Sequence, residues 1–207
     1  MTYGTVHLIS TIDDALKEVL MNIFVGCSSR DTNNTEYNDL ALGIGKYIAS
    51  HKHNFIFGGC DVGLMGKVYS VVSKNTDSKV IISMSSAFID QIENISYDYI
   101  KHFDTMTQRK EYLISVADVI IILPGGLGTI DELITAIESK RSGEHAKPII
   151  IANVNHYFDD ILKMFEKTFA EGFADSKSRE LYYVATSLNE VIALLDSLKR
   201  TVSPNEF

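Results

Sequence analysis

The sequence predicts an α/β protein in which a doubly wound parallel sheet of about seven strands lies between two helical layers. Short apolar runs alternate with amphipathic stretches from residue 22 to residue 198. This order implies parallel strands joined by right-handed crossovers. Residues 119–123 are apolar throughout, as expected of a strand that helices cover on both faces.

Each element follows from its own pattern. Residues 35–51 predict a helix, because Tyr37, Leu40, Ile44 and Ile48 recur at helical spacing. Residues 99–103 predict a short edge strand. The expected strands, in order, are 22–25, 55–57, 80–82, 99–103, 119–123, 148–152 and 181–184, and the expected helices are 35–51, 64–74, 107–116, 128–140, 157–169 and 188–198.

Composition is typical of a folded single-domain protein. The chain has 207 residues, of which 45% are hydrophobic and 22% charged, so disorder is excluded as the dominant state. We expect one domain at residues 21–200, an N-terminal appendage at residues 1–20 and a tail at residues 201–207. The formal net charge of −8 disfavours nucleic acid as a partner, because phosphate backbones attract basic surfaces.

Other features exclude further classes. Cys27 and Cys60 are too few for a disulfide framework or a zinc site. The N-terminus lacks the basic region of a signal peptide, and no apolar run approaches the roughly 20 residues of a membrane span. The six histidines show no metal-ligand spacing; His102 is expected near the site but has no predicted role. We expect a cytoplasmic protein without membrane partner, metal or cofactor.

Four segments of small and polar residues follow predicted strands, at residues 26–30, 58–63, 83–86 and 124–129. The carboxyl ends of parallel strands share one edge of the sheet, where doubly wound folds bind ligands. Unpaired amides in a glycine-rich turn that opens a helix can bind phosphate. Residues 125–129 combine three glycines and the hydroxyl of Thr129 at one helix start, which favours phosphate binding.

The common nucleotide fingerprints do not fit the other glycines. Gly58 and Gly59 are followed by Gly63 at a spacing that is not GxGxxG. Gly66 and Lys67 have the order of the last glycine and the lysine of a P-loop (GxxxxGK[ST]), but the rest of that pattern is missing. Asp61 stands where the first glycine is needed, and Val68 stands where a serine or threonine would bind magnesium. For Gly58 and Gly59, tight turning and phosphate binding remain equally good interpretations.

Charged residues near this edge each allow two interpretations. Thr129-x-x-Glu132 has the form of a capping box, in which Glu132 returns to the cap amide; a catalytic carboxylate is the alternative. Asp131 suits the positive end of a helix. Arg109 and Lys110 stand at a helix start, where cations oppose the dipole. They are either a solvated pair or an anion clamp.

Several motifs together resemble a known family. Residues 124–132 (PGGLGTIDE) match the signature PGGxGTxxE, and residues 106–110 (MTQRK) match M-x-x-R-K. Residues 57–66 (FGGCDVGLMG) are similar to YGGGxxGLMG, and residues 26–29 (GCSS) to a GSS turn. These motifs resemble the LOG (Lonely Guy) family of cytokinin riboside 5′-monophosphate phosphoribohydrolases, long labelled lysine decarboxylases.

The resemblance implies a Rossmann-like fold, a homodimer, and hydrolysis of N6-modified or plain adenosine 5′-monophosphates to free base and ribose 5-phosphate. It implies that Glu132 stabilises an oxocarbenium-like sugar or activates water, and that Arg109 offsets negative charge. The residues that it implies for substrate binding are Lys110, Gly125, Gly126, Gly128, Thr129, Asp131, Ser28, Gly58, Gly59 and Met106.

The chain departs from the family pattern at several positions. Cys60 replaces the third glycine of YGGG, Leu127 replaces an aromatic residue, and the family's Trp-x-Gln motif is absent. Residues 85–104, expected to shape the base pocket, also match poorly. The choice between N6-modified and plain AMP therefore stays open. The alternative function is a carrier of a phosphorylated ligand, similar to molybdenum-cofactor carriers.

Overall fold

The structure, a computed structural model, describes residues 20–86 and 95–199. Its strands are β1 (Asn22–Gly26), β2 (Asn54–Phe57), β3 (Val80–Ser85), β4 (Tyr99–Phe103), β5 (Val119–Ile122), β6 (Ile149–Ala152) and β7 (Tyr183–Ala185). Its α-helices are α2 (Thr35–Ser50), α3 (Gly63–Val72), α4 (Met106–Val116), α5 (Leu127–Arg141), α6 (Asp159–Ala170) and α7 (Leu188–Leu198). Two 3₁₀ helices are η2 (Val154–His156) and η3 (Ser176–Leu181). The predicted appendage, apart from Leu20, and the predicted tail lie outside the described residues.

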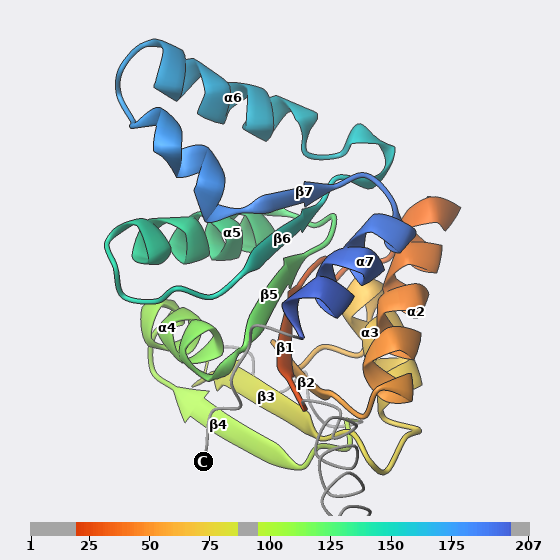
Figure 1. Ribbon diagram of the computed structural model, residues 1–207. Coiled ribbons are helices and arrows are strands. Elements are labelled where there is room, and N and C mark those ends of the chain that lie inside the picture. Colours follow the sequence, from red (N-terminus) through yellow and green to blue (C-terminus); the bar gives the residue numbers. More distant parts are fainter. Residues whose placement is uncertain (1–19, 87–94, 200–207) are drawn as a thin grey trace, which may run out of the picture.

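The seven strands form one parallel sheet in the order β4-β3-β2-β1-β5-β6-β7. The chain runs outward from β1 to the edge strand β4, returns to the centre as β5, and then runs outward to β7 (Figure 1). The predicted doubly wound fold and its edge strand are thereby confirmed. Strand order reverses between β1 and β5, the topological switch point at which such folds bind ligands.

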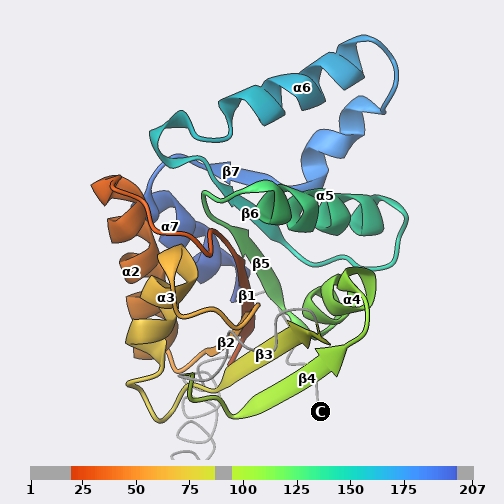
Figure 2. The same ribbon diagram turned by 180° about the vertical axis from the view of Figure 1, so that it is seen from behind.

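Alternating side chains of the strands face two separate hydrophobic cores. Ile23 and Val25 of β1 pack in the core that includes side chains of α2, α3 and α7. Phe24 packs in the core that includes side chains of α4 and α5. Figures 1 and 2 show these two groups of helices on opposite faces of the sheet. Every residue of β1, β2, β5 and β6 is buried, as expected for a sheet covered on both faces.

The structure corrects the prediction that residues 83–86 form a loop. Strand β3 continues to Ser85, because Ser83, Met84 and Ser85 pair with β4. Only Ser86 follows the strand within this part of the described chain.

The predicted helix at residues 157–169 is observed as α6, which begins at Asp159 rather than at residue 157. The 3₁₀ helix η2 lies before it, and Asn155 and His156 there adopt left-handed φ values of 52° and 57°. The last strand starts at Tyr183 rather than at residue 181, because η3 occupies the preceding residues. Among residues 20–86 and 95–199, no helix has the length and apolarity needed to cross a membrane.

Candidate active site

A cavity of about 500 Å³ lies at the switch point of the sheet. Segments that follow β1, β2 and β5 line it together with residues of α3, α4 and α5. The lining residues are Cys27, Ser28, Ser29, Arg30, Gly58, Cys60, Met65, Met106, Arg109, Lys110, Gly126, Leu127, Gly128, Thr129, Asp131 and Glu132. The prediction that the post-strand segments share one edge is therefore confirmed for residues 26–30, 58–63 and 124–129.

A buried ion pair joins Arg109 of α4 to Glu132 of α5 within this lining. Arg109 Nη1 lies 3.2 Å from Glu132 Oε1, and the two side chains are only 8% and 7% exposed. A solvated location for Arg109 is therefore wrong. Two opposite charges taken out of water at a cavity wall are costly, and such placement is typical of functional sites.

Ser83 of β3 holds Arg109 from the side of the sheet. Arg109 Nε donates to the Ser83 carbonyl oxygen at 2.9 Å, and Ser83 Oγ donates to the Arg109 carbonyl oxygen at 3.3 Å. The guanidinium is thus fixed at one nitrogen by the sheet and at another by Glu132. Sequence reasoning missed this function of Ser83, since no local pattern shows which carbonyl a distant arginine meets.

Two glycines leave room for the ion pair. A Cβ atom at Gly58 would lie 2.2 Å from Arg109 Nη2, and one at Gly26 would lie 2.9 Å from Glu132 Oε2. Close approach of Arg109 therefore explains Gly58. Gly59 has a φ of 79° and is buried, so tight turning explains that glycine.

Burial controls proton affinity at the site. It raises the pKa of the Glu132 carboxyl above its ordinary value, although the Arg109 guanidinium opposes the shift. Burial, followed by the charges of Glu132 and Cys60, raises the pKa of the Cys27 thiol well above its ordinary value. Cys27 therefore stays protonated near neutral pH and is a poor nucleophile. A carboxyl whose pKa is raised suits proton transfer near neutral pH.

The turn before α5 offers unpaired backbone N–H groups. The helix begins after the N-cap residue Gly126, and no side chain caps it. Within the described chain, the amides of residues 126–129 donate no hydrogen bond. A Cβ atom at Gly126 or Gly128 would meet no atom within 4 Å. The turn thus presents free N–H groups and the positive helix end to open space, an arrangement that binds anions.

The capping box predicted for Thr129 and Glu132 is wrong. Because α5 begins at Leu127, Thr129 is its third residue and cannot be the cap. The Thr129 hydroxyl instead faces Gly125, where an added Cβ atom would lie 2.1 Å from Thr129 Oγ1. Glu132 reaches across to Arg109 instead of back to its own helix start.

Lys110 connects α4 to α5 at the edge of the cavity. Its Nζ donates to both carboxylate oxygens of Asp131, at 2.7 and 2.8 Å, and to Thr135 Oγ1 at 3.0 Å. The Lys110 side chain is 13% exposed and that of Asp131 is 55% exposed. Asp131 therefore compensates the lysine charge, and Lys110 still contributes to the cavity lining.

Most of the predicted site residues come together in this one cavity. Arg109, Glu132, Lys110, Asp131, Ser28, Gly58, Met106, Gly126, Gly128 and Thr129 line it, whereas Gly59 and Gly125 do not. His102 is exposed on the edge strand β4 and does not line the cavity, contrary to the expectation that it lies near the site.

Some lining residues were not predicted as site residues. Arg30, Met65 and Leu127 are among them; Leu127 is the residue that replaces the aromatic side chain of the family pattern. Within the described residues, no group of three or more His, Cys, Asp or Glu side chains could hold a metal ion.

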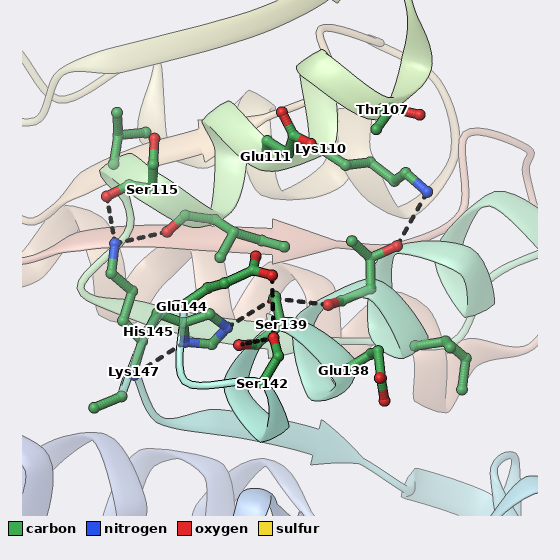
Figure 3. Close-up of a pocket in the computed structure, with 15 residues that line it drawn as sticks. Thr107, Lys110, Glu111, Ser115, Glu138, Ser139, Ser142, Glu144, His145 and Lys147 are labelled. Atoms are coloured by element: carbon green, nitrogen blue, oxygen red, sulfur yellow. Dashed lines mark hydrogen bonds between the residues drawn. The ribbon is translucent and has the colours of Figure 1, made fainter.

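A second, larger groove of about 1100 Å³ runs between α4, α5 and the loop that follows α5. Figure 3 shows Lys110 reaching from α4 toward α5 at one end, and His145 and Lys147 at the other. His145 Nε2 lies 3.0 Å from the Ala136 carbonyl oxygen, and Lys147 Nζ donates to the Ile114 carbonyl oxygen at 2.6 Å. These two side chains thus connect the loop to the helices.

The fold and the site define the chain as a Rossmann-like α/β protein whose candidate active site lies at the switch point. Residues 65–195 match the family described as "Possible lysine decarboxylase". Among curated proteins, the chain is 32% identical to cytokinin riboside 5′-monophosphate phosphoribohydrolase LOG2 of Arabidopsis thaliana over 87% of this chain and 84% of that protein. It is 31% identical to the probable cytokinin riboside 5′-monophosphate phosphoribohydrolase LOG4 of Oryza sativa subsp. japonica, over 84% of this chain and 75% of that protein.

A solved structure of the Moco carrier protein from Chlamydomonas reinhardtii superposes with a TM-score of 0.64 at 19% identity, over 88% of this chain and 99% of that chain. This likeness shows the fold. The extent of the family match and the identity to curated relatives show more: the chain belongs to the LOG family, the "Possible lysine decarboxylase" family, whose curated relatives are named as hydrolases.

Proposed function

We propose that this chain hydrolyses the N-glycosidic bond of adenosine 5′-monophosphates, plain or N6-modified, to free base and ribose 5-phosphate. One observation carries the proposal: a buried Arg–Glu pair shares a cavity with a turn of unpaired N–H groups. Hydrolysis of a phosphorylated glycoside needs both features: the turn to bind the phosphate and the ion pair to act on the glycosidic bond. The names of the curated relatives support the same reaction.

The turn at residues 126–129 would hold the 5′-phosphate. Its free N–H groups and the positive end of α5 favour a dianion. The cavity volume of about 500 Å³ lies within the range of small-molecule sites. With the phosphate fixed at the helix start, the sugar carbon would lie toward the ion pair.

Glu132 and Arg109 would divide the chemistry. Cleavage of the glycosidic bond develops positive charge on the ribose, and the Glu132 carboxylate stabilises that charge or takes a proton from the attacking water. The electron pair of the broken bond leaves with the base, and the Arg109 guanidinium offsets the resulting negative charge. The water oxygen bonds to the sugar carbon and yields ribose 5-phosphate. The proton taken from the water is passed to the departing base, which leaves as the neutral free base while Glu132 returns to its carboxylate form.

Apolar side chains at the cavity favour a substrate with an apolar part. Leu127 is 86% exposed and Met106 is 40% exposed, and both line the cavity beside Met65. Such side chains would contact a base or its N6 substituent. Both the plain and the N6-modified nucleotide remain candidates.

Base release tests the proposal. The purified protein is incubated with AMP, N6-isopentenyl-AMP, GMP and CMP, and the products are separated by chromatography. Preferential release of isopentenyladenine would assign a cytokinin-activating enzyme, and release of adenine alone would assign an AMP nucleosidase. Absence of base release from all four nucleotides would refute the proposal.

Glu132→Gln tests the assigned residue, and Glu138→Gln is its matched control on the same helix. Glu138 is exposed and pairs with Arg141. We expect Glu132→Gln to lower kcat by about 10²–10⁴-fold, the usual contribution of a general base. Glu138→Gln should retain the parent rate. Equal rates for both variants would contradict the function assigned to Glu132.

The alternative is a carrier that binds a phosphorylated ligand without turnover. Such a protein would use the turn at residues 126–129 but would have no need of the Arg109–Glu132 pair. Tight binding of a phosphorylated ligand without base release would favour it. We also propose the homodimer that the resemblance implies. Size-exclusion chromatography with light scattering tests it, since a 23 kDa species would contradict a dimer.

A further inference from the structure

Tyr157 contacts the phosphate-binding turn from outside the cavity. Its hydroxyl donates to the carbonyl oxygen of Gly125 at 2.5 Å, although Tyr157 does not line the cavity. In a regular helix, the N–H of Thr129 would donate to this carbonyl, four residues earlier. Among the described residues that bond is absent, and the tyrosine hydroxyl takes its place.

A bond to the Gly125 carbonyl fixes the neighbouring amide. Gly125 and Gly126 share one planar trans peptide, so the C=O of Gly125 and the N–H of Gly126 point in opposite directions. Tyr157 approaches the C=O from outside the cavity, while Gly126 lines the cavity. The N–H of Gly126 is therefore directed away from Tyr157, toward the side on which a ligand can lie.

We propose that Tyr157 is a positioning residue that aims the Gly126 N–H at the phosphate of the substrate. This inference rests on the proposed function, because it assigns the ligand of that N–H. Without the hydroxyl, the Gly125 carbonyl would turn to the N–H of Thr129. That rotation would extend α5 backwards and would remove two N–H groups from the binding turn, those of Gly126 and Thr129.

The backbone before Tyr157 is strained in a way that delivers this hydroxyl. Asn155 and His156 have left-handed φ values of 52° and 57°, a backbone conformation that residues other than glycine adopt rarely. Such strain persists only where the surroundings hold it, and it is concentrated at functional sites. Here Asn153 holds it: its N–H donates to Ala185 O at 2.7 Å, and its Oδ1 accepts from Phe158 N at 2.7 Å.

Aromatic neighbours fix the ring of Tyr157 independently of its hydroxyl. Tyr37 of α2 packs edge-on against it at a centroid distance of 5.6 Å, and Phe158 does so at 4.9 Å. Tyr157→Phe should therefore keep the ring in place and remove only the bond to Gly125. Tyr37→Phe is the matched control, because it removes a hydroxyl from the same aromatic pair and leaves the bond to Gly125 intact.

Binding of ribose 5-phosphate, measured by calorimetry against ribose, tests the inference without turnover. We expect Tyr157→Phe to weaken binding of ribose 5-phosphate at least about tenfold, because the loss of a single hydrogen bond to a charged group already has roughly that effect. Tyr37→Phe should match the parent. In base-release assays with AMP, Tyr157→Phe should raise KM about tenfold and leave kcat within about threefold, whereas general structural damage would lower kcat too.

Nuclear magnetic resonance of the parent protein gives a second test that needs no variant. Titration with inorganic phosphate should shift the Gly126 amide proton downfield, and an unchanged Gly126 signal at saturation would overturn the inference. Ribose 5-phosphate binding that Tyr157→Phe leaves within twofold would overturn it as well. Failure of the proposed function is distinguishable: a parent protein that releases no base but binds ribose 5-phosphate in a Tyr157-dependent way refutes only the nucleosidase.

Discussion

Substitution of Gly58 by alanine should disable the site with little effect on the fold. The new methyl carbon would lie 2.2 Å from Arg109 Nη2, so the guanidinium must retreat by about 1.2 Å to reach an ordinary contact of 3.4 Å. Nε is held by the Ser83 carbonyl at 2.9 Å, which leaves rotation of the tip as the accessible movement. That rotation acts on the contact with Glu132, which is already 3.2 Å long.

The expected magnitudes for Gly58→Ala separate activity from stability. A misplacement of about 1 Å can cost roughly 10²-fold in rate, so we expect kcat/KM to fall about 100-fold, or about 2.7 kcal/mol of transition-state stabilisation. The displaced atom is the end of a side chain, so the free energy of unfolding should fall by only about 1 kcal/mol, the low end of overpacking costs.

Base release and urea unfolding measure the two quantities, and Gly43→Ala is the matched control. A Cβ atom at Gly43 would lie 2.3 Å from Leu188 Cδ2, an equally close approach between α2 and α7 away from the cavity. Gly43→Ala should lower the free energy of unfolding and keep the parent kcat/KM per folded molecule. If Gly58→Ala retained kcat/KM within threefold, the position of the Arg109 guanidinium would not limit the reaction.

Other changes test the binding turn, the link between α4 and α5, and the core. Gly126→Ala, at φ −79° and in open space, should leave thermal stability unchanged and raise KM for AMP but not for adenosine, as steady-state kinetics would show. Lys110→Met should change the free energy of unfolding by under about 1 kcal/mol, because its partner Asp131 is half exposed, and should raise KM roughly tenfold; a large loss of stability at unchanged KM would make Lys110 a structural link alone. Burial lowers the pKa of His53 to about 4 from 6.5. Below pH 6.5 the unfolded chain therefore binds a proton that the folded chain refuses, so urea unfolding should show a loss of about 2 kcal/mol from pH 7 to pH 5, and His53→Leu should remove that loss.

Local patterns predict the sheet because its signals are local. The alternation of apolar runs and amphipathic stretches depends on neighbouring residues, and it located the strands and the helices that connect them. The post-strand segments could be placed at one edge because parallel strands leave no other arrangement. Arg109 and Glu132, 23 positions apart in the sequence, were assigned to one site by the resemblance to the LOG family rather than by the pattern of strands.

Contacts between distant elements are beyond such patterns. The capping box failed because its spacing is a property of one helix start, whereas the partner of Glu132 comes from another helix. Ser83 lies 26 residues from Arg109, and Tyr157 lies 32 residues from Gly125. Both contacts are made to backbone carbonyls, which every residue carries, so residue type gives no signal for them.

The ion pair at the switch point is better explained by chemistry than by stability. The apolar faces of the sheet already supply two cores, and a buried ion pair is often no more stabilising than apolar side chains of similar size. The strand ends nevertheless have no side chains at Gly26 and Gly58, which makes room for Arg109 and Glu132. A glycine also costs conformational entropy on folding. The fold therefore loses stability at Gly26, at Gly58 and at the buried ion pair itself, and in return keeps one charged pair beside a cavity. Such a loss is expected where the pair acts on a ligand and is unexpected where it only connects two helices.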